Sequence, residues 1–237
     1  MNLWKKLFLV FLIGSFAVYY TFEKGFLRFN YPDKDTFPVV GIDISHHQGK
    51  IDWQKAEGYG LSFVYIKATE GEDYQDPRFQ ENWQGAGSLS LAKGAYHFFT
   101  FCKSGEVQAK NFIATVPVVK DSLPHVVDLE FGGNCKARPS KAKLLSELQI
   151  FSNAILQKYG RRPIIYVTKD AYNIYLTNAL PKHKIWFRNI FFQPGKLPDG
   201  RKWDIWQFSN RGRIPGITGP VDLNVFHGKE EAFVKLM

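Results

Sequence analysis

Short apolar segments alternate with helical segments along most of this chain of 237 residues. Five of them, bounded by Gly, Pro or polar residues, are expected to be strands: 37–44, 61–68, 91–100, 124–131 and 164–167. Three more follow between Gly- and Pro-rich loops: 184–188, 204–208 and 221–225. The pattern predicts an α/β fold, specifically a parallel (β/α) TIM-like barrel that is regular early and irregular late. A doubly wound open sheet is the alternative, but no glycine-rich phosphate loop follows the first strand.

The helices between these strands have recognisable ends. Ser140 caps the clearest one, in which apolar residues recur at helical spacing until Gly160 ends it. Another helix is expected over 104–115. Asp76 is expected to cap a third, which extends to about residue 86.

Acidic residues close or follow several of the expected strands: Asp43, Glu70, Asp128, Glu130 and Asp222. A parallel barrel carries its chemistry at the carboxyl ends of its strands, so these side chains are expected to gather at one rim.

Two of these acids belong to one strand, 124–131. Side chains alternate between the faces of a strand, so Asp128 and Glu130 share a face. Two like charges side by side keep a proton on one of them near neutral pH, which suits acid catalysis. The alternative is that both acids lie at a wet strand end and form salt bridges.

Residues 1–36 differ from the rest of the chain. Two lysines precede an uncharged apolar run, residues 7–22, which is expected to be an export signal. The run continues past a small-x-small site at 15–17, which favours an uncleaved membrane anchor over a cleaved signal peptide. The basic flank then stays inside, and a domain formed by residues 37–237 faces the periplasm or cell exterior.

Composition narrows the classes of partner. The chain has 45% hydrophobic and 16% aromatic residues, so it has a core and also the flat rings on which sugars stack. Its net charge of +9 favours polyanions such as cell-wall polymer. No compact run of Lys and Arg has the spacing of a nucleic-acid site, and export conflicts with such a partner. We expect a monomer that binds no nucleic acid.

The cysteines and histidines give no metal-site pattern. Cys102 and Cys135 each follow an expected strand, and outside the cytoplasm they can form a disulfide that closes a loop of about 33 residues. The sequence does not decide between a disulfide and two free thiols. A metal site is not expected, because the histidines lack paired ligand spacing. No cofactor is expected either. These are expected to be packed or loop residues: His46, His47, His97 and His125.

Seven short motifs follow one another along the chain: Gly41-Ile42-Asp43-Ile44-Ser45, Asp52-Trp53, Lys67-Ala68-Thr69-Glu70-Gly71, Gly94-Ala95-Tyr96-His97-Phe98, Asp128-Leu129-Glu130, Trp206-Gln207-Phe208 and Val221-Asp222-Leu223-Asn224. In this order they resemble glycoside hydrolase family 25, whose members are lysozymes that cut bacterial peptidoglycan. The resemblance covers about residues 38–230. An Asp-x-Glu pair alone is common, whereas seven ordered motifs are not.

The resemblance implies a flattened, irregular barrel with a groove for the glycan. It also implies hydrolysis of the β-1,4 bond between N-acetylmuramic acid and N-acetylglucosamine. Glu130 matches the general acid, and Asp128 matches the carboxylate that assists the substrate 2-acetamido group. Asp43 and Asp222 match two further active-site acids, and all three aspartates are expected to raise the pKa of Glu130. Strand spacing leaves retention and inversion open, whereas the resemblance implies substrate-assisted retention.

Further residues match positions that line the groove of the family: Tyr96, Tyr166, Trp186 and Gln207. Lys67 and Glu70 either contact the substrate or form a structural ion pair. One departure follows Trp186, where the family usually has a small residue and this chain has Phe187 and Arg188. The cation is expected to narrow the groove or to bind a peptide-stem carboxylate.

The sequence therefore predicts a membrane-tethered or secreted muramidase that binds a peptidoglycan glycan strand. The alternative is a non-catalytic peptidoglycan-binding module on the same barrel. All four matching acids are present, which argues against that alternative because binding alone does not require them.

Overall fold

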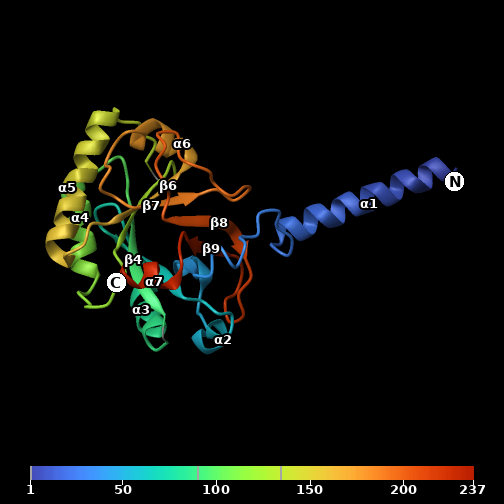
Figure 1. Cartoon of the computed structure of the whole chain (residues 1–237), viewed down its shortest axis with the longest axis horizontal. Coiled ribbons are helices and arrows are strands. Elements are labelled where there is room, and N and C mark those ends of the chain that lie inside the picture. Colours follow the sequence, from blue (N-terminus) through green and yellow to red (C-terminus); the bar gives the residue numbers. More distant parts are fainter. Residues whose placement is uncertain (1, 90, 134) are drawn as a thin grey trace.

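The computed structural model describes residues 2–89, 91–133 and 135–237, and its centre is a closed barrel of eight strands (Figure 1). The strands in this part of the chain are β1 (Val40–Ile44), β2 (Phe63–Glu70), β3 (Tyr74–Gln75), β4 (Ala92–Phe98), β5 (Val126–Leu129), β6 (Ile164–Thr168), β7 (Ile185–Arg188), β8 (Ile205–Gly212) and β9 (Val221–Phe226). The sheet order is β1-β9-β8-β7-β6-β5-β4-β2-β3, and β1 also pairs with β2, which closes the barrel. The predicted barrel is confirmed, and the open sheet is wrong.

The last strand runs against the others. Each pairing from β1 through β2, β4, β5, β6 and β7 to β8 is parallel, but β9 is antiparallel to both β8 and β1. The prediction of an entirely parallel barrel is therefore wrong at β9. A short loop joins β8 to β9, and antiparallel neighbours need no helical crossover. Asp222 consequently lies at the start of its strand, yet at the same rim as the carboxyl ends of the other strands, with Asp43 as its partner in the β1–β9 register.

Helices cover the outer face of the barrel. In chain order they are η1 (His46–Gln48), α2 (Trp53–Glu57), α3 (Phe79–Gly87), α4 (Gly105–Thr115), α5 (Lys141–Tyr159), α6 (Lys169–Ala171), η2 (Tyr172–Leu176) and α7 (Glu230–Val234). The two longest of these, α4 and α5, pack side by side along one flank (Figure 1). Ser140 accepts a hydrogen bond from the Lys143 N–H at the start of α5, and Gly160 ends the helix with φ of 73°, as predicted.

Helix α3 begins at Phe79, so the prediction that Asp76 caps it is wrong. The Asp76 carboxylate instead accepts hydrogen bonds from the backbone N–H groups of His46 and Arg78. It also contacts the His46 ring at 2.8 Å. The acid therefore ties the loop after β1 to the segment before α3.

Alternation along the strands divides the core into two layers. On β5, Val126 points into the barrel, whereas Val127 and Leu129 pack under the helices. The interior is crowded by aromatic rings, and Gly41 makes room for one of them. A methyl group at that position would overlap the Phe63 ring, which explains why a glycine stands between apolar residues of β1.

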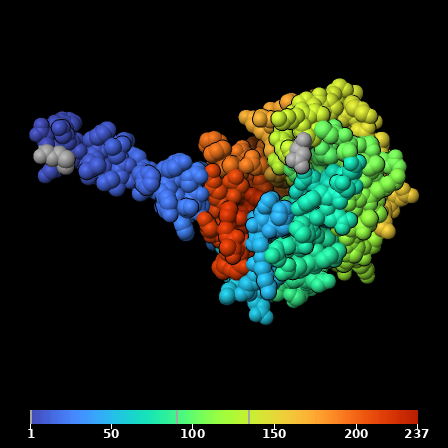
Figure 2. Space-filling view, turned by 180° about the vertical axis from the view of Figure 1, so that it is seen from behind, coloured from blue at the N-terminus to red at the C-terminus, as the bar shows by residue number. Residues whose placement is uncertain are grey.

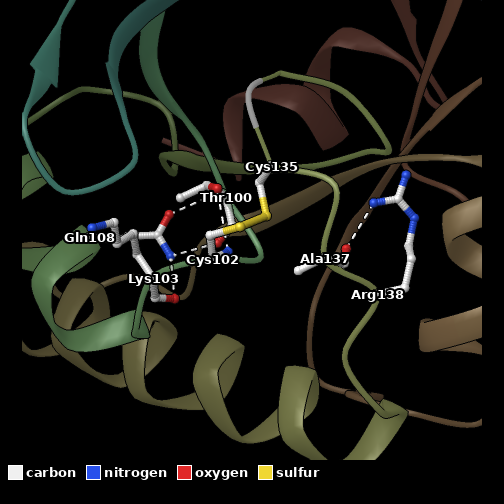
Figure 3. The surroundings of a disulfide bond; sticks show 7 residues. All are labelled: Thr100, Cys102, Lys103, Gln108, Cys135, Ala137 and Arg138. Atoms are coloured by element: carbon white, nitrogen blue, oxygen red, sulfur yellow. Dashed lines mark hydrogen bonds between the residues drawn. A yellow bond between two sulfur atoms is a disulfide. The ribbon is translucent and has the colours of Figure 1, made fainter.

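A disulfide joins the loops that follow β4 and β5 (Figure 3). Cys102 lies between β4 and α4, and Cys135 lies between β5 and α5, 33 residues later. The Gln108 side chain braces the first of these loops, because its amide donates to the Thr100 and Lys103 carbonyls. Of the two alternatives left by the sequence, the structure has the bonded pair.

The N-terminal helix α1 (Leu3–Glu23) projects away from the barrel (Figures 1 and 2). By length and mean hydropathy, 1.4 over its best window, it is able to span a bilayer, a property that signal sequences share. The membrane anchor and the boundary between residues 36 and 37 stay predictions.

Candidate active site

The strand ends surround a cavity of about 450 Å³. Nine of the ten predicted site residues line it: Asp43, Lys67, Tyr96, Asp128, Glu130, Tyr166, Trp186, Gln207 and Asp222. Glu70 does not line it. Its carboxylate instead accepts a hydrogen bond of 2.7 Å from the Lys67 ammonium group, which itself lies in the cavity wall.

Strand β5 and the residue after it present two of the acids. Val126, Asp128 and Glu130 all line the cavity, so they share the face that alternation predicted. Among the described residues, no donor reaches the buried Oδ1 of Asp128. A buried carboxylate oxygen without a partner is costly, so this atom is suited to accept a hydrogen bond from a bound ligand.

Asp43 is the centre of a buried hydrogen-bond network. Its Oδ2 accepts from the side-chain amides of Asn224 at 2.7 Å and Gln207 at 3.1 Å. The Tyr166 hydroxyl donates to Gln207 Oε1, and the Trp186 indole N–H donates to Asn224 Oδ1. The network joins strands β1, β6, β7, β8 and β9 below the cavity, and it fixes the Asp43 carboxylate in one orientation.

The three aspartates hold protons more tightly than aspartates in water. Burial raises the pKa of Asp43 to about 6, although the amides of Asn224 and Gln207 lower it. Burial, and then the charge of Glu130, raise the pKa of Asp128 well above its usual range. Burial and the charge of Asp43 do the same for the pKa of Asp222. The cluster therefore carries fewer than four negative charges at neutral pH.

Glu130 is tuned by opposing effects. Burial raises the pKa of Glu130, whereas the cations Arg188 and Lys67 lower it. A raised pKa suits an acid that must stay protonated near neutral pH. The predicted direction is confirmed, but its main cause is burial and not the charges of the three aspartates.

A family model for glycosyl hydrolases family 25 matches residues 42–217 of the chain. The chain belongs to glycosyl hydrolase family 25. It is therefore a glycoside hydrolase of the lysozyme class. The alternative of a non-catalytic module is not supported.

One solved structure and two known proteins are similar to this chain over most of its length. A family 25 glycosyl hydrolase from Bacillus anthracis superposes with a TM-score of 0.83 at 39% identity, over 88% of this chain and 98% of that one. YegX of Escherichia coli strain K12 is 36% identical over 201 residues, which are 83% of this chain and 72% of the relative. Lysozyme M1 of Streptomyces globisporus is 33% identical over 85% of this chain and 72% of its own.

This family 25 site contains residues that the sequence left without a role. Asn224 was part of a recognised motif, but its bond to Asp43 was not foreseen. The signal was present, because Asn224 follows Asp222 by two positions on one strand and so shares its face. Others in the wall belong to loops or to the short helix η1, where no periodicity points to a cavity: Ser45, His47, Gln48 and Pro220.

Arg188, the departure from the usual family 25 pattern, lies in the cavity wall at the end of β7. Phe187, its neighbour, points the other way and packs under the helices. The cation is therefore placed to meet a ligand, and its contact with a peptide-stem carboxylate stays a prediction.

The histidines are placed as packed or loop residues. His97 and His125 are buried, and burial lowers the pKa of each, to about 4 and about 3, so both are neutral. His46 and His47 belong to η1, directly after β1. Within the described residues, no group of three or more His, Cys, Asp or Glu side chains has the arrangement of a metal site.

Proposed function

We propose that the protein is a muramidase that cleaves the β-1,4 bond between N-acetylmuramic acid and N-acetylglucosamine in peptidoglycan. The observation that carries this proposal is the cavity wall, which contains four carboxyl groups, one of which, Asp128, has an oxygen, Oδ1, that no donor reaches within the described part of the chain. The similarity to lysozyme M1 of Streptomyces globisporus supports it. The substrate bond and the residue roles are our proposal.

The first step breaks the glycosidic bond. Glu130 donates its proton to the oxygen that leaves with the N-acetylglucosamine unit. The carbonyl oxygen of the substrate's own 2-acetamido group attacks the anomeric carbon and forms a cyclic oxazolinium ion. The electron pair of the broken bond stays on the leaving oxygen, so the step needs no oxidant or metal ion to balance.

Asp128 positions the acetamido group. Its free Oδ1 accepts the N–H of that group, which holds the carbonyl oxygen against the anomeric carbon and stabilises the positive charge on the ring. An aspartate retains an acceptor lone pair in either protonation state, so the raised pKa of Asp128 is compatible with this role.

Water completes the reaction. Glu130, now ionised, removes a proton from a water molecule that attacks the anomeric carbon and opens the oxazolinium ring. Two displacements at one carbon restore its original configuration, so the product retains the anomeric configuration of the substrate. Asp43 and Asp222 supply the remaining negative charge near the cationic ring.

Residues 1–36 act as an export signal and remain as a membrane anchor in this proposal, and residues 37–237 form the catalytic domain. The support is the length of α1, whose 21 residues span about 30 Å, the thickness of a bilayer's hydrocarbon core. Mass spectrometry of the mature amino terminus tests it, because cleavage near residue 17 would remove the anchor.

The catalytic proposal is tested by digesting purified peptidoglycan with the wild type, Glu130→Gln and Glu106→Gln. Glu106 is an exposed glutamate on α4, so its variant makes the same chemical change away from the cavity. We expect new reducing ends from the wild type and Glu106→Gln only. Borohydride reduction should convert those ends to muramitol.

Two outcomes would contradict the proposal. Activity in Glu130→Gln equal to the wild type would remove the general acid from its role. Glucosaminitol in place of muramitol would show that the enzyme cuts the other bond of the glycan strand.

A further inference from the structure

The segment between α1 and the barrel is packed against strand β8. The Asn30 side chain donates to the Phe208 carbonyl at 2.7 Å, and the Arg213 side chain donates to the Lys24 carbonyl at 2.9 Å. Glu23, the last residue of α1, forms an ion pair of 3.1 Å with Arg211. The segment therefore holds the end of α1 against the barrel.

Gly25 is the closest point of this contact. It is buried and has φ of 77°, and a methyl group there would overlap the Arg211 carbonyl oxygen. A side chain at this position would be strained by the backbone conformation and would also displace the segment from β8. A glycine at position 25 is therefore what allows the segment to pack against β8.

An apolar face surrounds the docking site. Phe26 and Phe29 of the segment are 68% and 73% exposed, and Phe191 and Phe192 of the loop after β7 are 57% and 74% exposed. No other phenylalanine among the described residues of 37–237 is exposed to this degree. The two groups are neighbours, because Ile190 lines the same crevice as Phe22 and Leu27.

We define the rim face as residues 23–31, 189–192 and 209–213. This face carries a surplus of positive charge. Its single acid is Glu23, and its cations are Lys24, Arg28, Arg211 and Arg213. Exposed aromatic rings next to cations are characteristic of surfaces at the boundary between lipid headgroups and acyl chains.

We propose that the rim face lies on the surface of the membrane that α1 spans, with its aromatic rings in the headgroup region and its cations on anionic phospholipid headgroups. This rests on the proposed membrane anchor. A bilayer is the occupant that the structure favours, because α1 enters the rim face at Glu23 and any membrane that holds α1 must be adjacent to it.

The catalytic cavity is next to this surface. Asn210 lines both the cavity and the crevice beneath the docked segment. The enzyme is therefore fixed with its cleft at the membrane surface, and its substrate is the glycan closest to the lipid. A flexible tether would have let the cleft reach outward into the wall.

A fluorescent label tests the contact in the full chain, reconstituted in vesicles of phosphatidylethanolamine and phosphatidylglycerol. Both native cysteines are bonded to each other, so a thiol label reacts only at an introduced cysteine. Phe192→Cys places it on the rim face, and Val118→Cys, 61% exposed in the segment before β5, is the control. We expect lipid carrying a headgroup-proximal nitroxide to quench the label at 192 and not at 118.

Gly25→Ala tests whether docking holds the face in place. Gly60→Ala is its matched control, since Gly60 has φ of 81° and no atom within 4 Å of an added methyl group. We expect Gly25→Ala to reduce the quenching at position 192 and Gly60→Ala to leave it unchanged. Both variants should still float with the vesicles.

The possible failures are distinguishable. A full chain that does not float with vesicles would remove the anchor and the rim-face proposal together. A chain that floats while its label at 192 remains unquenched would overturn the rim-face proposal alone, including the case in which a protein partner covers the face. Neither result bears on the muramitol assay, which tests the chemistry.

Discussion

At the scale of single residues, the cavity wall holds carboxyl groups in buried positions that do not favour their charge. Asp43 is buried and accepts two amide hydrogen bonds, yet its pKa is raised to about 6 by that burial. Four carboxyl groups in one cavity wall repel one another when ionised. In the proposed reaction this cost is offset, because the arrangement supplies an acid and anions for the cleavage of a glycosidic bond.

Replacing Asp43 by Asn should stabilise the fold near neutral pH. The folded-state pKa of about 6 lies above the ordinary value of 3.8, so the folded protein binds the proton more tightly and loses stability as pH rises between these values. Asn keeps an acceptor for both amides without the charge. We expect an increase of up to about 3 kcal/mol in the free energy of unfolding at pH 7.

The measurement is urea unfolding of the detergent-solubilised chain at several pH values. The difference between Asp43→Asn and the wild type should shrink as pH falls below about 6 and disappear at about pH 3, where Asp43 of the wild type is mostly protonated in both the folded and the unfolded state. A variant that is less stable than the wild type at pH 7 would show that the charge itself holds the network together.

Replacing Arg188 by Gln should change the pH dependence of activity. Arg188 lowers the pKa of Glu130, so its removal raises that pKa and keeps Glu130, the proposed general acid, protonated to higher pH. We expect the basic limb of the profile of kcat/KM against pH to shift to higher pH. Arg188→Lys, which keeps the charge, serves as the control. A basic limb that stays in place in both variants would mean that Arg188 does not act on the acid.

At the scale of elements, sequence reasoning succeeded where periodicity is regular. It placed α5 and all eight strands of the barrel, and it predicted that Asp128 and Glu130 share a face. It missed β3, which has only two residues, because so short a strand has no detectable alternation. It also missed the direction of β9, since residue pattern does not encode whether a strand runs parallel or antiparallel to its neighbours.

The site was predictable to a similar depth. The ordered motifs predicted the four acids that line the cavity. The partners of Asp43 lie on strands that are far from it in the sequence, and one sequence does not reveal such contacts. Asp76 illustrates the same limit, because its pairing with the loop after β1 overrode its preference for a helix cap.

The disulfide is the element-scale feature with the clearest stability effect. It closes a 33-residue loop, so the chain-entropy model attributes about 3 to 4 kcal/mol to it. We expect the double variant Cys102→Ser, Cys135→Ser to lose about that much in denaturant unfolding. Reduction of the wild type should reproduce the loss. A much smaller effect would show that the two loops are held together by their other contacts.

At the scale of the whole molecule, the net charge predicts how the protein binds cell wall. A chain with charge +9 is attracted to anionic wall polymer, and this attraction is screened by salt. We expect Glu130→Gln protein, used to limit digestion of the walls, to bind isolated anionic cell walls less as sodium chloride is raised from about 50 to about 500 mM. Walls stripped of their anionic polymers are the control. If salt does not weaken binding, the cavity alone and not the net charge holds the protein on the wall.

The reversed strand β9 has a practical consequence for the carboxyl terminus. It leads from the cleft rim to the opposite end of the barrel, where Phe233 and Leu236 pack against the base of the interior. The two ends of the chain accordingly leave the barrel far apart (Figure 1). A reporter protein fused after Met237 would lie at the end of the barrel opposite the cavity, so the enzyme can be tagged and followed in cells while its cavity and the rim face stay unobstructed.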